Sequence, residues 1–145
     1  MSAVSKSKTT ALDRCYKSKH SITPQRMVVI DALINQKKAI SAYDLRNHLD
    51  VIGKKLNIAT IYRILDFWCS LNLVHRISSI NKFIFCANPN EKHTHIINCC
   101  QKCEKIVESC HKKMGIDFSG GIENLGLQLA SGSHLEVPVF CASCR

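Results

Sequence analysis

Residues 75–108, about a quarter of this 145-residue chain, hold seven of its sixteen histidines and cysteines, the side chains that most readily bind a transition metal ion. Imidazole, thiol and carboxylate groups recur there at short spacings: His75, Cys86, His93, His95, Cys99, Cys100, Cys103 and Glu108. A further cysteine pair, Cys141 and Cys144, follows near the C-terminus. Thiolates and imidazoles are ligands that zinc prefers in proteins. The sequence therefore predicts zinc chemistry in and after this stretch.

Two C-x-x-C knuckles predict a structural zinc site made by Cys100, Cys103, Cys141 and Cys144. Each knuckle can supply two thiolates to one tetrahedral ion. A redox dithiol or a pair of disulfides are the alternatives, but two such pairs favour a closed metal cage. Cys99 could replace Cys100, although the two-residue spacing favours Cys100.

The positive charge is confined to the first part of the chain. Residues 1–85 carry 14 Lys and Arg against 5 Asp and Glu, a net of +9, whereas residues 86–145 carry 6 of each. A basic half next to a neutral, cysteine-bearing half indicates two joined units, one that binds a polyanion and one that regulates it. Surface charge that serves only solubility is the alternative.

The first residues do not form a signal peptide, and no apolar run approaches the ~20 residues of a membrane-spanning helix. We therefore expect a cytoplasmic protein with no membrane partner. The nine cysteines are then better read as metal ligands than as disulfides, because cytosolic thiols stay reduced.

Helical periodicity predicts four helices before residue 73. A short helix is expected over 9–19. A second begins at Thr23-Pro24, with Met27, Ile30, Leu33 and Ile34 towards the core. The third is capped by Ser41, with Leu45, Leu49 and Ile52 facing inward. Asn57 caps the fourth, which spans 58–72.

The fourth helix has the pattern of a DNA recognition helix. Ile58, Ile61, Leu65 and Trp68 form an apolar stripe, while Thr60, Tyr62 and Arg63 fall off it near the N-terminal end. Polar side chains at that end can reach base edges in a major groove. An ordinary amphipathic helix with a solvated face remains the alternative.

Residues 73–77 and 82–86 predict a β-hairpin, which together with the preceding helices gives the order of a winged helix-turn-helix. A turn centred on Ile80-Asn81 would place His75 directly opposite Cys86, close enough to hold one ion. Farther on we expect strands over 95–99, 105–109 and 134–140, and a helix over 120–131 with Ile122, Leu125 and Leu129 inward.

The predicted fold class is α+β. A winged helix-turn-helix DNA-binding domain (residues 1–86) is followed by a hinge (87–91) and a small α/β dimerisation domain (92–145) that carries the four-cysteine zinc site. About sixty residues bury little core, so a structural metal and a partner subunit are the expected sources of stability for the second domain.

Several segments together resemble the ferric uptake regulator superfamily, and most closely its zinc uptake regulator branch. They are TPQR (23–26), AISAYDL (39–45), IATIYRILDF (58–67), LVHRI (73–77), FIFC (83–86) and the two cysteine knuckles. The resemblance covers the chain from about residue 12 onwards. One departure is Glu104, where many members have glycine after the first knuckle.

The resemblance implies a regulatory zinc site formed by His75, Cys86, His93 and Glu108, with His95 as the reserve ligand. It also implies that Tyr62 and Arg63 contact DNA, and we add Thr60 and Arg26 as candidate contacts. Two Zn²⁺ ions per chain, one structural and one regulatory, are expected.

The predicted function is a homodimeric, zinc-responsive repressor that binds an inverted-repeat operator and controls zinc uptake genes. The alternative within the superfamily is an iron or peroxide sensor, but the thiol of Cys86 favours zinc over a hard-ligand ferrous site. Two other classes are weaker. No glycine-rich elbow or partner acid accompanies a cysteine, so we do not expect an enzyme. The other class is a zinc-ribbon adaptor that binds protein, which a salt-sensitive, metal-dependent shift of an inverted-repeat duplex would exclude.

Overall fold

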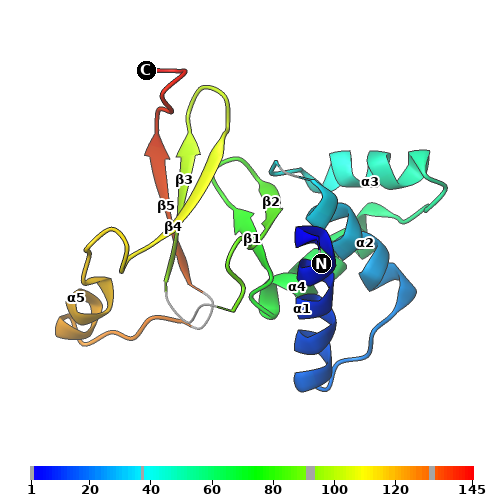
Figure 1. The fold of residues 1–145 in the computed structure, drawn as a ribbon, viewed down its shortest axis with the longest axis horizontal. Helices are drawn as coiled ribbons and strands as arrows, with labels where there is room; N and C mark the ends of the chain where they lie inside the picture. Colours follow the sequence, from blue (N-terminus) through cyan, green and yellow to red (C-terminus); the bar gives the residue numbers. More distant parts are fainter. Residues whose placement is uncertain (1, 37, 91–93, 131–132) are drawn as a thin grey trace. The chain divides into compact units, whose positions relative to one another are not determined.

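The computed structural model describes residues 2–36, 38–90, 94–130 and 133–145. The chain divides into two compact units, Met1–Pro89 (unit 1) and Asn90–Arg145 (unit 2). The border between them falls inside the segment 87–91. In chain order the elements of unit 1 are α1 (Ala3–Lys17), α2 (Pro24–Asn35), α3 (Ala42–Val51), α4 (Ile58–Ser70), β1 (Val74–Ile77) and β2 (Lys82–Phe85) (Figure 1).

Each helix of unit 1 begins at a side chain that caps it. Thr23 accepts a hydrogen bond from the amide of Arg26, Ser41 from that of Asp44, and Asn57 from that of Thr60, at 3.2, 3.1 and 2.8 Å. These caps satisfy amides that have no partner within the helix. They place three of the four helix starts where the sequence predicts them. The exception is α1, which begins at Ala3 because Ser2 caps it, several residues before the expected start.

The core of unit 1 lies between the helices and the hairpin. Ile30, Leu33, Leu45, Leu49, Ile61, Leu65, Trp68 and Phe83 have 1% exposure or less. The predicted apolar stripes therefore face the core, with one error. Ile52 is 55% exposed, because α3 has ended by Val51 and the chain turns away at Gly53, whose φ is +78°.

The hairpin β1–β2 completes unit 1. Its strands pair antiparallel, with Val74 opposite Phe85 and His75 opposite Ile84. A backbone bridge adds Ile40 to the outer side of β2: its amide donates to the carbonyl of Phe83 and its carbonyl accepts from the amide of Phe83, at 2.9 and 2.8 Å. The hairpin is therefore held by the loop between α2 and α3 as well as by its own ladder.

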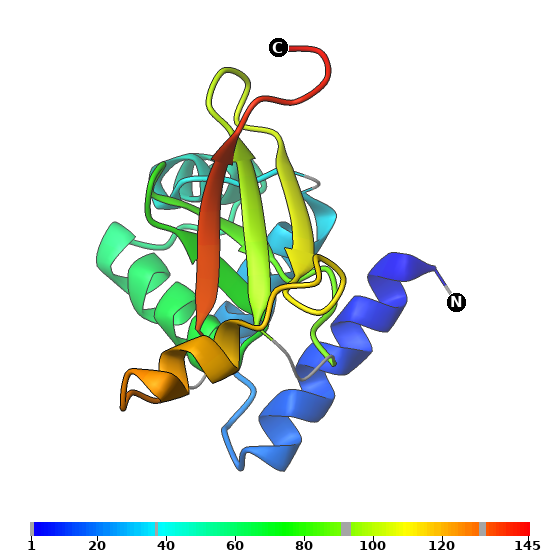
Figure 2. The ribbon, with the colours of Figure 1, turned by 90° about the vertical axis from the view of Figure 1, so that its left-hand side faces the viewer.

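Unit 2 is built on a sheet in the order β4–β3–β5, with β3 at His95–Cys100, β4 at Ile106–Cys110 and β5 at His134–Val139. Strand β3 runs antiparallel to β4 and parallel to β5. Figure 2 shows the β3–β4 turn and the C-terminal segment at one end of this sheet and α5 (Phe118–Asn124) at the other. The sheet therefore brings the two cysteine knuckles to the same end.

Helix α5 is shorter than the sequence predicts. It ends at Asn124, and Gly126 follows with a φ of +72°, a left-handed conformation that stops a helix. Leu125 is 72% exposed, so the prediction that it faces inward is wrong. Strands β3, β4 and β5 all lie within one residue of their predicted bounds.

Candidate metal centres and recognition helix

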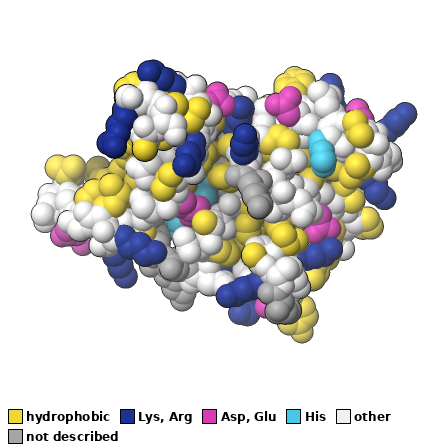
Figure 3. Space-filling view, turned by 45° about the horizontal axis from the view of Figure 1, so that its top comes forward, with side chains coloured by type: hydrophobic (Ala, Val, Ile, Leu, Met, Phe, Trp, Pro, Cys, Tyr) yellow, Lys and Arg dark blue, Asp and Glu magenta, His cyan; other side chains and the backbone are white. Residues whose placement is uncertain are grey.

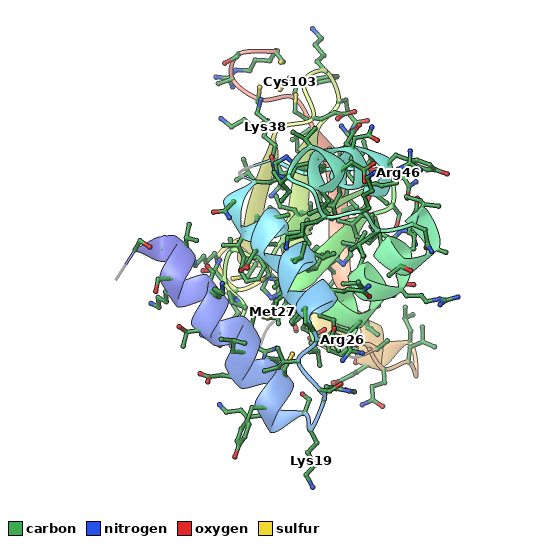
Figure 4. The ribbon with its side chains drawn as sticks, turned by 90° about the vertical axis from the view of Figure 1, so that its right-hand side faces the viewer. Lys19, Arg26, Met27, Lys38, Arg46 and Cys103 are labelled. Carbon is green, nitrogen blue, oxygen red and sulfur yellow. The ribbon has the colours of Figure 1, made fainter. Side chains whose placement is uncertain are left out.

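The four knuckle cysteines meet at one end of the unit 2 sheet. One ligand atom from each of Cys100, Cys103, Cys141 and Cys144 lies within 4.8 Å of the others. The Sγ atoms of Cys103 and Cys141 are 3.7 Å apart. Two thiolates on one tetrahedral zinc ion stand about 3.8 Å apart, since each Zn–S bond is about 2.3 Å. Figure 4 labels Cys103 beside the C-terminal segment. The cluster thus has the donor set and the spacing of a structural zinc site.

Backbone amides prepare Cys100 to be a thiolate. Hydrogen bonds from the amides of Cys103, Cys141 and Lys102 lower the pKa of the Cys100 thiol to about 6. The amide of Cys141 lies 3.4 Å from this sulfur. By contrast, side-chain hydrogen bonds with Cys141 and Cys103 raise the pKa of Cys144 to about 12. Zinc binding to this cluster would therefore displace the proton that Cys144 otherwise retains.

Strand geometry separates Cys99 from Cys100. Successive side chains of a strand point to opposite faces, so these two neighbours in β3 cannot both face the knuckles. Cys100 belongs to the cluster, whereas burial raises the pKa of Cys99 and favours its neutral thiol. The structure therefore brings together the four cysteines that the two-residue spacing selects.

The hairpin of unit 1 carries a second group of candidate ligands, His75 and Cys86. Both are buried, and a ring nitrogen of His75 lies within 4.8 Å of the sulfur of Cys86. Their direct opposition, expected from a turn at Ile80-Asn81, is wrong. His75 pairs with Ile84, and the amide of Cys86 donates to the carbonyl of Leu73 at 2.8 Å.

The turn explains the shifted register. Four residues, 78–81, connect Ile77 to Lys82, and Asn81 takes a left-handed φ of 49° there. Relative to the predicted turn this moves the pairing by two residues, which keeps every side chain on its face. His75 and Cys86 are thus diagonal neighbours on one face of the hairpin. An imidazole nitrogen and a thiolate sulfur on one tetrahedral zinc ion would be about 3.6 Å apart. The observed separation, within 4.8 Å, is compatible with this spacing.

A further pair of candidate ligands lies on unit 2. His95 and Glu108 share a face of the sheet, and the Nδ1 atom of His95 is 2.7 Å from the Oε1 atom of Glu108. Their side chains are only 12% and 6% exposed. His134 and Glu136 of β5 lie on the same face, with Nε2 and Oε1 3.6 Å apart. The predicted ligand His93 lies outside the described residues.

The pairing of His95 with Glu108 was not predicted, although the sequence contains its signal. Alternate residues of a strand point to the same face, so His95 and Ile97 share a face of β3. The β4 residues that pair with them lie on that face too. The register that brings Glu108 to this face depends on the length of the knuckle turn. That length could not be read from hydrophobicity alone.

The candidate DNA contacts lie on α4 and α2. Arg63 is exposed and Thr60 half-buried. Tyr62 is half-buried, and its ring stands edge-on to the ring of Phe83, with centroids 6.3 Å apart. Arg26 of α2, labelled in Figure 4, is already engaged within unit 1. Its guanidinium donates to the carbonyl of Ser21 at 2.6 Å and stacks over Phe67 at 3.7 Å, so a DNA contact by Arg26 stays a prediction.

A family model described as the ferric uptake regulator family matches residues 17–118. This chain belongs to that family. The match spans α2 to α4, the hairpin and the first cysteine knuckle, so it includes both the helical unit and the start of the sheet.

Individual relatives of this ferric uptake regulator family member include regulators named for zinc and for iron. The zinc uptake regulation protein of Escherichia coli (strain K12) is 29% identical over 131 residues, which cover 90% of this chain and 76% of that protein. The ferric uptake regulation protein of Haemophilus influenzae is 33% identical over 89 residues, 60% of each chain.

Solved structures of the family extend the likeness to the whole fold. A zinc uptake regulator complexed with zinc and DNA has a TM-score of 0.84 and 27% identity, covering 99% of this chain and 95% of that one. The holo form of XcZur has a TM-score of 0.76 and 28% identity, covering 97% of each chain. Within the described part of this chain, the helices are all too short or too polar to cross a membrane.

Proposed function

We propose that this chain is a zinc-responsive, sequence-specific DNA-binding repressor of zinc uptake genes. The observation that carries the proposal is the hairpin pair, a buried imidazole and a buried thiol within 4.8 Å of each other. A thiolate with an imidazole suits Zn²⁺ better than Fe²⁺. The zinc uptake regulation protein of Escherichia coli and the regulator solved with zinc and DNA support the same reading.

In this proposal the chain binds two zinc ions, which have different roles. Cys100, Cys103, Cys141 and Cys144 hold a structural ion that stabilises unit 2. His75 and Cys86, together with Glu108 and a histidine of the segment 93–95, hold a regulatory ion. Mixed nitrogen, sulfur and oxygen ligands should bind zinc less tightly than four thiolates, which suits reversible sensing.

The regulatory ion would act as a clamp on the hinge. An ion that takes ligands from both units restricts their relative motion, and so selects one separation of the two recognition helices in a homodimer. A palindromic operator requires about 34 Å between half-sites. The metal-free protein would keep its fold but sample other separations, and zinc would favour the binding-competent state through its differential affinity.

Unit 2 supplies the proposed dimer surface. Val107, Met114, Ile116, Leu125, Leu127 and Phe140 are each more than 40% exposed. Hydrophobic side chains gather at the surface in the left-hand part of Figure 3. Small units with exposed apolar surface gain stability from a partner subunit. We place this homodimer in the cytoplasm, where reduced thiols can bind zinc.

A metal-by-metal binding assay tests the proposal. A duplex containing an inverted repeat is first selected from a random pool with zinc-loaded protein. Protein treated with a chelator mild enough to leave the structural zinc is then mixed with this duplex, and Zn²⁺, Fe²⁺ or Mn²⁺ is added alone. Restoration of binding by Zn²⁺ at the lowest concentration is expected. Restoration by Fe²⁺ alone would instead support the iron sensor, and equal binding without any exchangeable metal would remove the regulatory role.

The identity of the regulatory histidine is tested by two single variants. His93→Ala and His95→Ala are compared for zinc stoichiometry and for zinc-dependent DNA binding. The family resemblance favours His93, whereas the 2.7 Å contact with Glu108 favours His95. The variant that loses the exchangeable zinc identifies the ligand. Replacement of a histidine that only orients Glu108 should weaken zinc binding about 10–100-fold without abolishing it.

A further inference from the structure

The two faces of the unit 1 hairpin carry different residues. His75 and Cys86 lie on one face, with Ile84 between them in the ladder. Arg76 and Phe83 are paired directly across the ladder on the opposite face. Phe83 is fully buried in the helical core, so this second face is the one turned towards α4. The proposed regulatory ligands and the recognition helix α4 therefore lie on opposite faces of the short hairpin β1–β2.

The backbone of Phe83 is anchored, and its buried ring lies next to Arg76 of β1 and Tyr62 of α4. Two backbone hydrogen bonds with Ile40 anchor the Phe83 peptide, at 2.9 and 2.8 Å. The guanidinium of Arg76 lies 5.5 Å from the centroid of the Phe83 ring. The ring of Tyr62 stands edge-on to the same ring, with a centroid separation of 6.3 Å and an interplanar angle of 66°.

Strand β1 is the part of the hairpin that a metal ion would steady. Its partner β2 is held by Ile40, whereas among the described residues β1 is bonded in the ladder only to β2. Two-stranded hairpins are marginal by themselves. An ion joining His75 of β1 to Cys86 at the end of β2 would cross-link the strands and fix Arg76 over the Phe83 ring. The ring would then hold Tyr62 in one orientation.

We propose that Phe83 is a positioning residue, which transmits metal binding on the hairpin to Tyr62 of the recognition helix through their edge-on ring contact. This inference rests on the proposed function, because it requires that His75 and Cys86 bind the regulatory ion. It adds a route inside unit 1 that is independent of the clamp on the hinge.

Fluorine NMR with 3-fluorotyrosine follows the effect directly. The chain has three tyrosines, and Tyr16 and Tyr43 are 84% and 54% exposed, so they serve as internal references. The resonance of Tyr62 is assigned with Tyr62→Phe. Zn²⁺ is titrated into protein that retains its structural zinc. The Tyr62 resonance should shift with the exchangeable zinc, while the other two stay unchanged.

The test variant is Phe83→Leu, and its matched control is Phe85→Leu. Phe85 lies on the same strand and the same face and packs against the same core, but Tyr62 contacts Phe83. Phe83→Leu should retain the exchangeable zinc and abolish the zinc-induced shift of Tyr62. Its zinc-dependent gain in affinity for the selected duplex should fall by at least about fivefold, the lower end of typical couplings between sites. Phe85→Leu should behave like the wild type.

Distinct outcomes separate the inference from the function on which it rests. If zinc changes neither DNA affinity nor Tyr62 in the wild type, the proposed function fails first. If zinc acts on the wild type and equally on Phe83→Leu, only the role of Phe83 is overturned. Should Phe83→Leu not fold, wild-type protein labelled with 4-fluorophenylalanine decides the question, because a Phe83 resonance that zinc leaves unmoved also overturns the inference.

Discussion

The guanidinium of Arg14 joins the N-terminal helix to the end of unit 1. Its Nη2 atom donates to the carbonyl oxygen of Pro89 at 2.6 Å, and its Nη1 atom donates to the carbonyl of Leu71 at the same distance. Leu71 is the C-cap of α4, and Pro89 is the last residue of unit 1. One side chain therefore fixes the point at which the chain leaves unit 1 relative to the end of α4.

Replacing Arg14 should destabilise unit 1. Hydrogen bonds from a charged donor contribute about 1.5–3 kcal/mol, so Arg14→Ala should lower the free energy of unfolding by roughly that amount. Urea denaturation of the zinc-loaded protein measures the change. Lys17→Ala, at an exposed position on the same helix, is the control and should stay within about 0.5 kcal/mol of the wild type. Equal stabilities of the two variants would show that the Arg14 contacts contribute nothing.

Loss of one knuckle cysteine should unfold unit 2. A structural zinc site contributes on the order of 10 kcal/mol of folding free energy, so Cys103→Ala should lose its tight zinc and its dimer. Zinc content by mass spectrometry and sedimentation measure both effects. Cys99→Ala is the matched control, because Cys99 lies next to the cluster but outside it. A folded, dimeric Cys103→Ala protein would refute the structural role.

The helices and the cysteine cluster could be predicted because their signals are local. Caps such as Ser41 and Asn57 stand at fixed positions before the helices that they start, and a C-x-x-C knuckle needs no knowledge of the rest of the fold. The end of α5 was mispredicted although its signal is also local. Apolar spacing continued through Gly126, but the left-handed conformation of this glycine ends the helix.

Register was the part that the sequence could not supply. The pairing of His75 with Ile84 depends on a four-residue turn in which Asn81 adopts a positive φ, and nothing in Ser-Ser-Ile-Asn selects that turn over a two-residue one. The contact between His95 and Glu108 likewise depends on the register of β3 against β4. The residues that come together could largely be predicted from the chain, whereas the register that pairs them across each sheet required the structure.

Removal of a hairpin ligand should separate the two proposed zinc roles. His75→Ala or Cys86→Ala should abolish zinc-dependent binding of the selected duplex, since each removes a regulatory ligand, while one tight zinc per chain and the dimer persist. Zinc stoichiometry, sedimentation and a gel shift measure these properties. Simultaneous loss of both ions would contradict the division into two sites.

Cys69→Ala is the thiol control for Cys86→Ala. Burial, together with the neighbouring carboxylate of Asp66, raises the pKa of the Cys69 thiol to about 11. This group is therefore a neutral thiol near pH 7 and a poor zinc ligand, because the thiolate is the form that binds metal. Cys69→Ala should keep both zinc ions. A lower number of zinc ions per chain in this variant would mean that loss of a thiol outside the proposed sites also removes zinc.

Replacing Arg63 should change sequence preference as well as affinity. Arg63 is exposed on the second turn of α4 after the Asn57 cap, close to the proposed groove-facing end. If it reads a base edge, Arg63→Ala should cost about 1–3 kcal/mol and relax the preference at one position of each half-site. Selection from a random duplex pool with both proteins measures the preference. A uniform loss of affinity with unchanged sequence preference would make Arg63 a phosphate contact. The salt dependence of binding tests this independently, because each lost phosphate contact reduces the slope of log affinity against log salt concentration by about one.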